Sequence, residues 1–201
     1  MSIYERQLTL DLNTDISISV VGSGGIGFWV CKFAAMSGIK DIYVFDPDVI
    51  EESNLNRLDI PERFIGKNKA DMVKIVVEML RPMCSVSARP FKYQDFNAVK
   101  TDWVVDCTDN YESQINNQKI AKSMGSVYCK AGYDGESFSI NDTVAEWGEA
   151  EDGYTITPSW VVPASIVAAL TVAKIMKYSD CETSDSISNL MAPTITWKDK
   201  K

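Results

Sequence analysis

The chain has 201 residues, of which 45% are hydrophobic and 24% charged, values typical of globular proteins and not of disordered or fibrous ones. Its 20 basic and 28 acidic residues give a net charge of −8. That balance argues against nucleic acid as a partner, because binding phosphates depends mainly on Lys and Arg. Histidine is absent, which excludes an imidazole base and any zinc site with a His ligand.

The cysteine pattern and the apolar segments indicate the cellular setting. The cysteines are odd in number, widely spaced and without a C-x-x-C pair, unlike disulfide frameworks or Cys-rich zinc sites; they are Cys31, Cys84, Cys107, Cys129 and Cys181. The longest apolar run, 160–176, is interrupted by Pro163 and Lys174 and is too short for a membrane span. The first residues lack a signal-peptide pattern. We therefore expect a cytoplasmic protein with no membrane segment.

Strand and helix patterns alternate along the chain. The first half predicts, in order, a strand over 16–21, a helix over 26–36 ended by Gly38, a strand over 41–45, a long loop over 46–66, a helix over 68–83 and a strand over 85–91. The second half predicts a strand over 103–107, a helix over 113–124, a strand over 126–130, part of a hairpin over 137–147, a helix from 163 to 178 and a last strand over 194–197. The Ser- and Asp-rich stretch 179–188 is the one candidate spacer.

This alternation predicts an α/β fold: a Rossmann-like, mostly parallel sheet with helices on both faces and an antiparallel extension near the C-terminal end. Ligands of such sheets bind beyond the carboxyl ends of the strands. The chemistry is therefore expected just after Val21, Phe45 and Cys107.

A glycine-rich turn follows the first of these strands. Gly22, Gly24 and Gly27 fit G-x-G-x-x-G, and Gly25 enriches it further; backbone that closely approaches a phosphate leaves no room for a Cβ. Asp46 lies 19 residues past Gly27, at the end of the second strand, where a carboxylate binds a ribose. A nucleotide is the favoured ligand. The alternatives are a turn chosen only for packing and the dinucleotide site of a dehydrogenase.

The stretch after Asp46 separates these alternatives. It carries Asp48, Asn54 and Arg57, and Lys69 begins the next helix. A dinucleotide site needs no cations such as Arg57 and Lys69 at this position. A triphosphate attacked at its α-phosphorus does need them, because negative charge builds on the phosphate oxygens. For Arg57 and Lys69 the alternative is a pair of ordinary surface salt bridges.

Acidic residues follow the fourth strand. Asp109 lies on the same sheet edge and, beside a triphosphate, is a candidate ligand for Mg²⁺; the alternative is a cap for the following helix. Asp106 lies within the strand and is expected to be structural.

Together these residues resemble the ThiF/MoeB/HesA family of adenylyltransferases, whose fold is shared by ubiquitin-activating enzymes. The matching motifs are YERQ at 4–7, GSGGIG at 22–27, DPDVIEESNLNR at 46–57, GKNK at 66–69 and DCTDN at 106–110, with a weaker match from AGYDG at 131–135 to about residue 178. The resemblance implies one ThiF-type domain over 1–201, with a nucleotide-binding half (about 1–135) and a substrate and dimer half (about 136–201).

The resemblance further implies adenylation of the C-terminal carboxylate of a small ubiquitin-like (ThiS/MoaD-like) protein ending in Gly-Gly, by a homodimer that uses ATP and Mg²⁺. It implies phosphate binding by the glycine loop, Asn54, Arg57 and Lys69, ribose binding by Asp46, and metal binding by Asp109. Arg6 would reach the ATP of the neighbouring subunit.

The chain departs from thioester-forming members of the family because no cysteine lies between Lys130 and Asp180. Cys129, in an apolar strand, is expected to be a core residue. We therefore expect the adenylate to pass directly to an outside acceptor. The alternatives are adenylation of a small-molecule or tRNA-linked carboxylate, and a non-catalytic subunit of a heterodimer.

Overall fold

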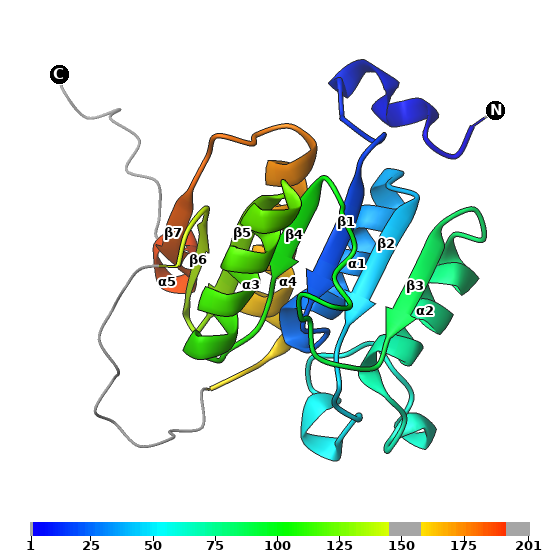
Figure 1. Ribbon diagram of the computed structural model, residues 1–201, viewed down its shortest axis with the longest axis vertical. Coiled ribbons are helices and arrows are strands. Elements are labelled where there is room, and N and C mark those ends of the chain that lie inside the picture. The colour runs from blue at the N-terminus through cyan, green and yellow to red at the C-terminus, as the bar shows by residue number, and fades with distance from the viewer. Residues whose placement is uncertain (1, 145–157, 192–201) are drawn as a thin grey trace, which may run out of the picture.

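The computed structural model describes residues 2–144 and 158–191. Over these residues the chain forms one seven-stranded sheet in the order β3-β2-β1-β4-β5-β6-β7 (Figure 1). The strands are β1 (Ser17–Val21), β2 (Asp41–Phe45), β3 (Ser85–Arg89), β4 (Trp103–Asp106), β5 (Val127–Tyr133), β6 (Ser137–Asn141) and β7 (Thr183–Ser186). The helices are α1 (Gly25–Ser37), α2 (Lys69–Leu80), α3 (Tyr111–Met124), α4 (Val161–Met176) and α5 (Ile187–Met191), with short 3-10 helices η1 (Glu5–Leu10), η2 (Glu52–Asn54) and η3 (Glu62–Phe64).

The sheet has a parallel part and an antiparallel part. Strands β3, β2, β1, β4 and β5 run parallel, whereas β6 pairs antiparallel with β5, and β7 antiparallel with β6. In the register, Val21 faces Phe45 on one side and Asp106 on the other. The carboxyl ends of β1, β2 and β4 are therefore level, as an α/β sheet with a C-terminal antiparallel extension requires. This confirms the predicted fold class.

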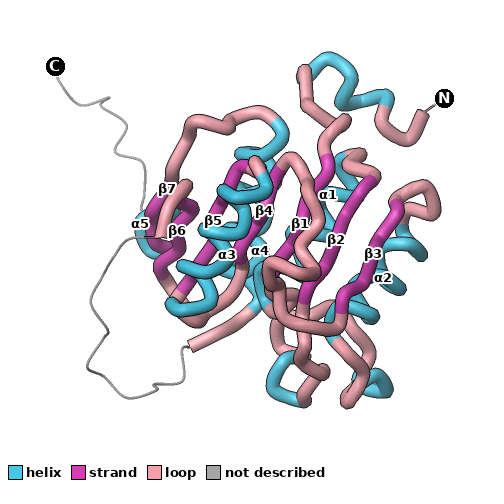
Figure 2. The backbone as a smooth tube through the Cα atoms, viewed as in Figure 1, coloured by secondary structure: helices cyan, strands magenta, loops and turns pink. Residues whose placement is uncertain are grey.

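Helices cover both faces of the sheet, as predicted. Helices α1, α2 and α4 lie on one face and α3 on the other (Figures 1 and 2). Alternate residues of each strand serve the two layers: Ile18 and Val20 of β1 join the core beneath α1, α2 and α4, whereas Val21 packs with Ile120 of α3. No helix in the described part of the chain is long and apolar enough to cross a membrane.

Local sequence explains where the helices begin and end. Helix α1 ends at Gly38, whose φ of 107° is a left-handed conformation and whose N–H reaches the carbonyls of Ala34 and Ala35, as glycine C-caps do. Helix α2 begins after Asn68, whose side chain accepts a hydrogen bond from the Asp71 N–H. The start of α2 lies at the carboxyl edge of the sheet, where Asn68 donates to the Asp46 carbonyl, and the candidate site lies at this edge.

The prediction of a spacer over 179–188 is wrong. Residues 183–186 form β7, and α5 begins at Ile187. The strand TSDS has no apolar periodicity to reveal it, because it is held by backbone pairing with β6, for example Ser184 with Ser139. Elsewhere, the strand expected over 85–91 ends at Arg89, before Pro90, and the strand expected over 126–130 continues to Tyr133. The strand expected over 194–197 lies outside the described residues.

Candidate functional site

The glycine loop joins the end of β1 to the start of α1. Gly22 has a φ of +83°, and a Cβ there would lie 3.2 Å from the Cys107 carbonyl. A Cβ on Gly27 would lie 1.9 Å from the Gly22 oxygen, so the turn itself requires glycine at both ends. A Cβ on Gly24, in contrast, would meet nothing within 4 Å. The loop is therefore closed behind and open in front of Gly24, where an anion has room to approach.

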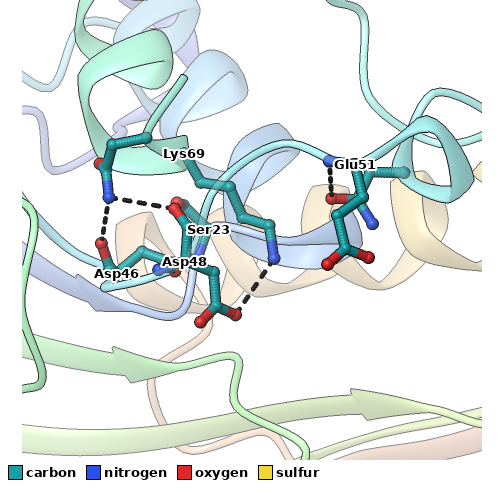
Figure 3. Close-up of polar contacts among 7 residues, drawn as sticks. Ser23, Asp46, Asp48, Glu51 and Lys69 are labelled. Atoms are coloured by element: carbon teal, nitrogen blue, oxygen red, sulfur yellow. Dashed lines mark hydrogen bonds and ion pairs between the residues drawn. The ribbon is translucent and has the colours of Figure 1, made fainter. Parts of the chain in front are cut away.

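The carboxylate of Asp46 holds this loop in place. It is buried, and its Oδ2 accepts hydrogen bonds from the Ser23 N–H at 2.6 Å and from the Ser23 hydroxyl at 3.0 Å. Its Oδ1 accepts from the Asp48 N–H at 2.9 Å. Figure 3 shows Ser23, Asp46 and Asp48 gathered at the end of β2. Sequence reasoning missed Ser23, although a hydroxyl residue inside the glycine motif was the available signal.

Lys69 lies beside this loop and pairs with Asp48. Its Nζ is 3.2 Å from Asp48 Oδ2, with the lysine side chain 14% exposed and the aspartate 66% exposed (Figure 3). Asn68 donates from Nδ2 to the carbonyls of Asp46 and Asp48, both at 3.0 Å, and thereby fixes the start of α2. Because Asp48 is largely in solvent, which screens its charge, this ion pair adds little net stability. Lys69 can therefore exchange Asp48 for a stronger anion at low cost.

Asn54 and Arg57 come from the loop between β2 and α2. Asn54 is buried, and its Oδ1 accepts from the Glu51 N–H at 3.1 Å, which caps η2. Arg57 donates from Nη1 to the Ser53 carbonyl at 2.7 Å and to Asn56 Oδ1 at 2.9 Å. Its Cδ is 3.0 Å from where a Cβ on Gly25 would lie. Within residues 2–144 and 158–191 the guanidinium has no carboxylate partner, so its charge is free for a ligand.

Two aspartates at the end of β4 differ sharply in their surroundings. Asp106 is fully buried; Oδ1 accepts from the Thr108 N–H and hydroxyl at 2.9 and 2.7 Å, and Oδ2 accepts from Asn117 and Tyr128 at 3.0 and 2.9 Å. This saturated carboxylate is structural. Asp109 is exposed and accepts no hydrogen bond from the described residues.

Asp109 is not the cap of the following helix. The cap of α3 is Asn110, whose Oδ1 accepts from the Ser113 N–H at 2.9 Å. A free carboxylate is the kind of oxygen donor that Mg²⁺ takes from a protein. In the described ranges no three His, Cys, Asp or Glu side chains cluster as a metal site. Asp109 is thus a candidate carboxylate ligand at this edge of the sheet, with no cluster of further protein ligands beside it in the described residues.

Arg6 is the one candidate residue that the fold does not bring to this site. It lies in η1, at the end of the sheet from which β1 starts (Figure 1). Tyr4 and Gln7 donate to the carbonyls of Ala35 and Ser37 at 3.1 and 2.6 Å and dock η1 on the last turn of α1. Since α1 has 13 residues, at ~1.5 Å each this is about 20 Å from the glycine loop. Arg6 cannot serve the site of its own chain.

The cysteines do not provide an activated thiolate. Cys31, Cys84 and Cys129 are buried; burial raises the pKa of Cys84 to about 11 and that of Cys129 to about 12. Burial and the charge of Asp106 also raise the pKa of Cys107, beside the glycine loop. Cys181 is exposed, in the turn after α4. A thiol with a raised pKa is a poor nucleophile at neutral pH.

The sequence comparisons identify relatives of this arrangement. The profile of the ThiF family matches residues 4–198. Over 113 residues the chain is 32% identical to "Adenylyltransferase and sulfurtransferase UBA4" of Eremothecium gossypii, covering 54% of this chain and 26% of that protein. Over 105 residues it is 33% identical to "tRNA threonylcarbamoyladenosine dehydratase" of Haemophilus influenzae, covering 49% of this chain and 40% of that protein. The chain thus matches less than half the length of these two relatives.

Comparison with solved structures finds proteins that share this fold. The crystal structure of Escherichia coli MccB with AMPCPP and MccA superposes with a TM-score of 0.72 and 22% identity, covering 92% of this chain and 65% of that one. At this identity the likeness concerns the fold alone. The Rossmann-like sheet with its antiparallel extension is therefore shared with that protein.

Proposed function

The chain belongs to the ThiF family, and on that premise we propose that it is an adenylyltransferase that uses Mg²⁺ and ATP to activate a C-terminal carboxylate. The substrate that we propose is a small ubiquitin-like protein ending in Gly-Gly. Attack of a carboxylate oxygen on the α-phosphorus of ATP forms an acyl-adenylate and releases pyrophosphate.

One observation carries this proposal: the glycine loop, Arg57 and Lys69 converge at the carboxyl edge of the sheet. Arg57 lies against Gly25, and among the described residues the ion-pair partner of Lys69 is the solvent-exposed Asp48. The two cations can therefore neutralise the charge that grows on phosphate oxygens during the attack. The attacking carboxylate is already ionised at pH 7. No base is needed, in keeping with a chain that contains no histidine.

Asp46 and Asp109 have different parts in the proposed site. Asp46 keeps the glycine loop in shape through Ser23 and offers its remaining acceptor positions to the ribose hydroxyls. Asp109 would hold Mg²⁺, which neutralises phosphate charge when bound. Asn54 keeps η2 in place, and with it the loop that carries Arg57.

We further propose a homodimer in which Arg6 acts on the partner's nucleotide. Apolar side chains are exposed around η1, including Ile3 and Leu8, and an apolar groove lies between α1 and α4. The groove is lined by Leu12, Phe33, Met36, Ser37, Ala169, Val172, Ala173 and Met176. Burying such a surface against a second copy is favourable, and it supports the placement of Arg6 near an interface.

A tRNA-linked carboxylate is the second candidate substrate, because one relative is named for a tRNA modification. The net charge of −8 opposes it, since RNA binding rests largely on basic residues. A small-molecule carboxylate fits the same chemistry. A non-catalytic subunit is disfavoured because the motif residues for ATP are all present.

The test is ATP–pyrophosphate exchange with purified protein, Mg²⁺ and a small ubiquitin-like protein ending in Gly-Gly. We expect exchange that depends on the terminal carboxylate and disappears when that carboxylate is amidated. Exchange that responds to tRNA and not to the protein tail would replace the proposed substrate. ATP turnover without pyrophosphate formation would overturn the proposed reaction.

A further inference from the structure

A chain of contacts leads from the end of β5 to Arg57. The hydroxyl of Tyr133, the last residue of β5, hydrogen-bonds the hydroxyl of Ser159. The Ser159 carbonyl accepts from Asn56 Nδ2 at 2.7 Å. The Oδ1 atom of the same Asn56 accepts from Arg57 Nη1 at 2.9 Å. Three polar contacts thus connect Tyr133, through Ser159 and Asn56, with Arg57.

The two ends of this chain of contacts meet again at the glycine loop. A Cβ on Gly25 would lie 2.8 Å from Tyr133 Oη and 3.0 Å from Arg57 Cδ. Tyrosine and arginine therefore both lie against the first residue of α1. Gly25 is the residue that makes room for them, and any larger side chain would displace one of the two.

The segment that carries Ser159 is itself firmly attached to the β5–β6 turn. Trp160 donates from Nε1 to the Gly135 carbonyl at 2.8 Å. Gly135 has a φ of +100°, and a Cβ there would lie 2.9 Å from Pro158. Ser159 lies within this attached segment, between Tyr133 on one side and Asn56 on the other, and the Tyr133 hydroxyl is the hydrogen-bond partner that orients the Ser159 side chain.

We infer that Tyr133 is a positioning residue for Arg57, acting through Ser159 and Asn56; the inference rests on the proposed role of Arg57 at the phosphates. An arginine has five N–H donors in a rigid fork. Here its hydrogen bonds to the described residues use Nη1 only. Because Nη1 is held by these hydrogen bonds, the guanidinium has a fixed orientation, and its Nε and Nη2 groups remain available to donate to phosphate oxygens. Pre-ordering the long side chain removes an entropy cost from the reacting complex.

The direct test is Tyr133→Phe in the ATP–pyrophosphate exchange assay. The ring packs against the apolar core, so this change removes the hydroxyl and leaves the packing. We expect kcat to fall roughly fivefold to tenfold, the worth of one neutral hydrogen bond. The KM for ATP should change less than about twofold, because the glycine loop, Asp46 and Lys69 bind the nucleotide independently of Tyr133. Tyr178→Phe, at an exposed tyrosine, is the matched control and should change neither.

A double-mutant cycle separates positioning from other roles. In an Arg57→Gln background, Tyr133→Phe should have no further effect on kcat, since residues that act through one another are not additive. An equal fall in both backgrounds would overturn the inference, because Tyr133 would then act without Arg57. An unchanged kcat in the single variant would overturn it as well. So would a lowered melting temperature with kcat intact, which indicates a structural role only.

A measurement without turnover keeps the inference distinguishable from the proposed function. The Nε–H resonance of Arg57, identified by its loss in Arg57→Gln, should be sharp in the unmodified protein and broadened in Tyr133→Phe. Identical resonances in both proteins would overturn the positioning role. A broadened resonance in a protein without any exchange activity would leave the positioning intact and overturn the adenylyltransferase proposal instead.

Discussion

The ends of β2 and β4 are built alike and differ in one respect. Each delivers a buried aspartate and, two or three residues later, an exposed one: Asp46 and Asp48 after β2, Asp106 and Asp109 at the end of β4. Both buried carboxylates are occupied by nearby N–H and hydroxyl donors. The exposed pair differ: Asp48 has Lys69 as a partner, whereas Asp109 has no partner among the described residues.

This difference indicates how one sheet edge can attract both charges of a metal–nucleotide complex. At β2 the exposed carboxylate of Asp48 balances the charge of Lys69, and under the proposed function a phosphate would take its place. At β4 the exposed carboxylate is uncompensated and suits a cation. The sequence shows only how many residues separate each exposed aspartate from the end of its strand, and this spacing does not distinguish an aspartate that pairs with a lysine from one that is free to bind a cation. The partner of each carboxylate does.

The largest expected effect comes from Asp109→Ala. Losing the carboxylate that we propose as the metal ligand should reduce ATP–pyrophosphate exchange by about 10²- to 10³-fold, as removing one strong electrostatic contact at a transferring group does. The free energy of unfolding should change by less than ~0.5 kcal/mol, because the side chain is exposed and unbonded. Exchange kinetics and urea unfolding measure the two effects. Near-normal exchange would mean that Asp109 holds no metal.

Asp106→Ala should act on stability instead. It leaves the Thr108 N–H and hydroxyl, Asn117 and Tyr128 without their acceptor, and we expect a loss of about 3 kcal/mol in unfolding free energy, since an unsatisfied buried donor costs ~1–3 kcal/mol. Urea unfolding is the measurement. Asp106→Asn, which keeps an oxygen acceptor, is the milder control. A variant as stable as the original would contradict the structural role.

Asp48→Ala should have a smaller effect, on affinity. Removing the partner of Lys69 makes its charge fully available, so the KM for ATP should fall by roughly twofold to fivefold, the range of an exposed ion pair. Stability should change little. Initial rates over a series of ATP concentrations provide the measurement. Loss of exchange in this variant would indicate that Asp48, and not Asp109, is the metal ligand.

The smallest effect is expected from thiol modification. Iodoacetamide at pH 7 should modify Cys181 first, because Cys31, Cys84 and Cys129 are buried and burial raises the pKa of Cys84 to about 11 and that of Cys129 to about 12. Exchange and transfer to the acceptor should both persist. Mass spectrometry locates the label. Exchange that survives while transfer fails would identify a cysteine nucleophile and contradict direct transfer.

The fold was largely predictable because its signals are local. Period-two strands, the glycine loop and the caps at Asn68 and Gly38 each depend on a few neighbouring residues. Strand β7 was missed because its pairing with β6, more than 40 residues earlier, leaves no trace in its own composition. Helix boundaries shifted by a few residues for the ordinary reason that helix ends are weakly specified.

For the candidate site, the sequence predicted that the residues at the ends of β1, β2 and β4 lie together, but not which hydrogen bonds connect them. The motif residues of strands β1, β2 and β4 meet because parallel strands end at one edge. The contacts of Ser23 with Asp46 and of Tyr133 with Ser159 join residues 23 and 26 positions apart, and nothing in the sequence pairs one hydroxyl with another group at that distance. The separation of Arg6 from its own site likewise depends on the docking of η1.

The most direct test of the account is Mn²⁺ binding in the presence of the ATP analogue AMPCPP, followed by electron paramagnetic resonance of the free ion. The protein should bind one Mn²⁺ with the analogue, and Asp48→Ala should bind it equally well or better. Asp109→Ala should bind it at least about tenfold more weakly, since a carboxylate ligand is lost. Equal binding by the Asp109→Ala protein and the unmodified protein would contradict the assignment of the metal to the end of β4.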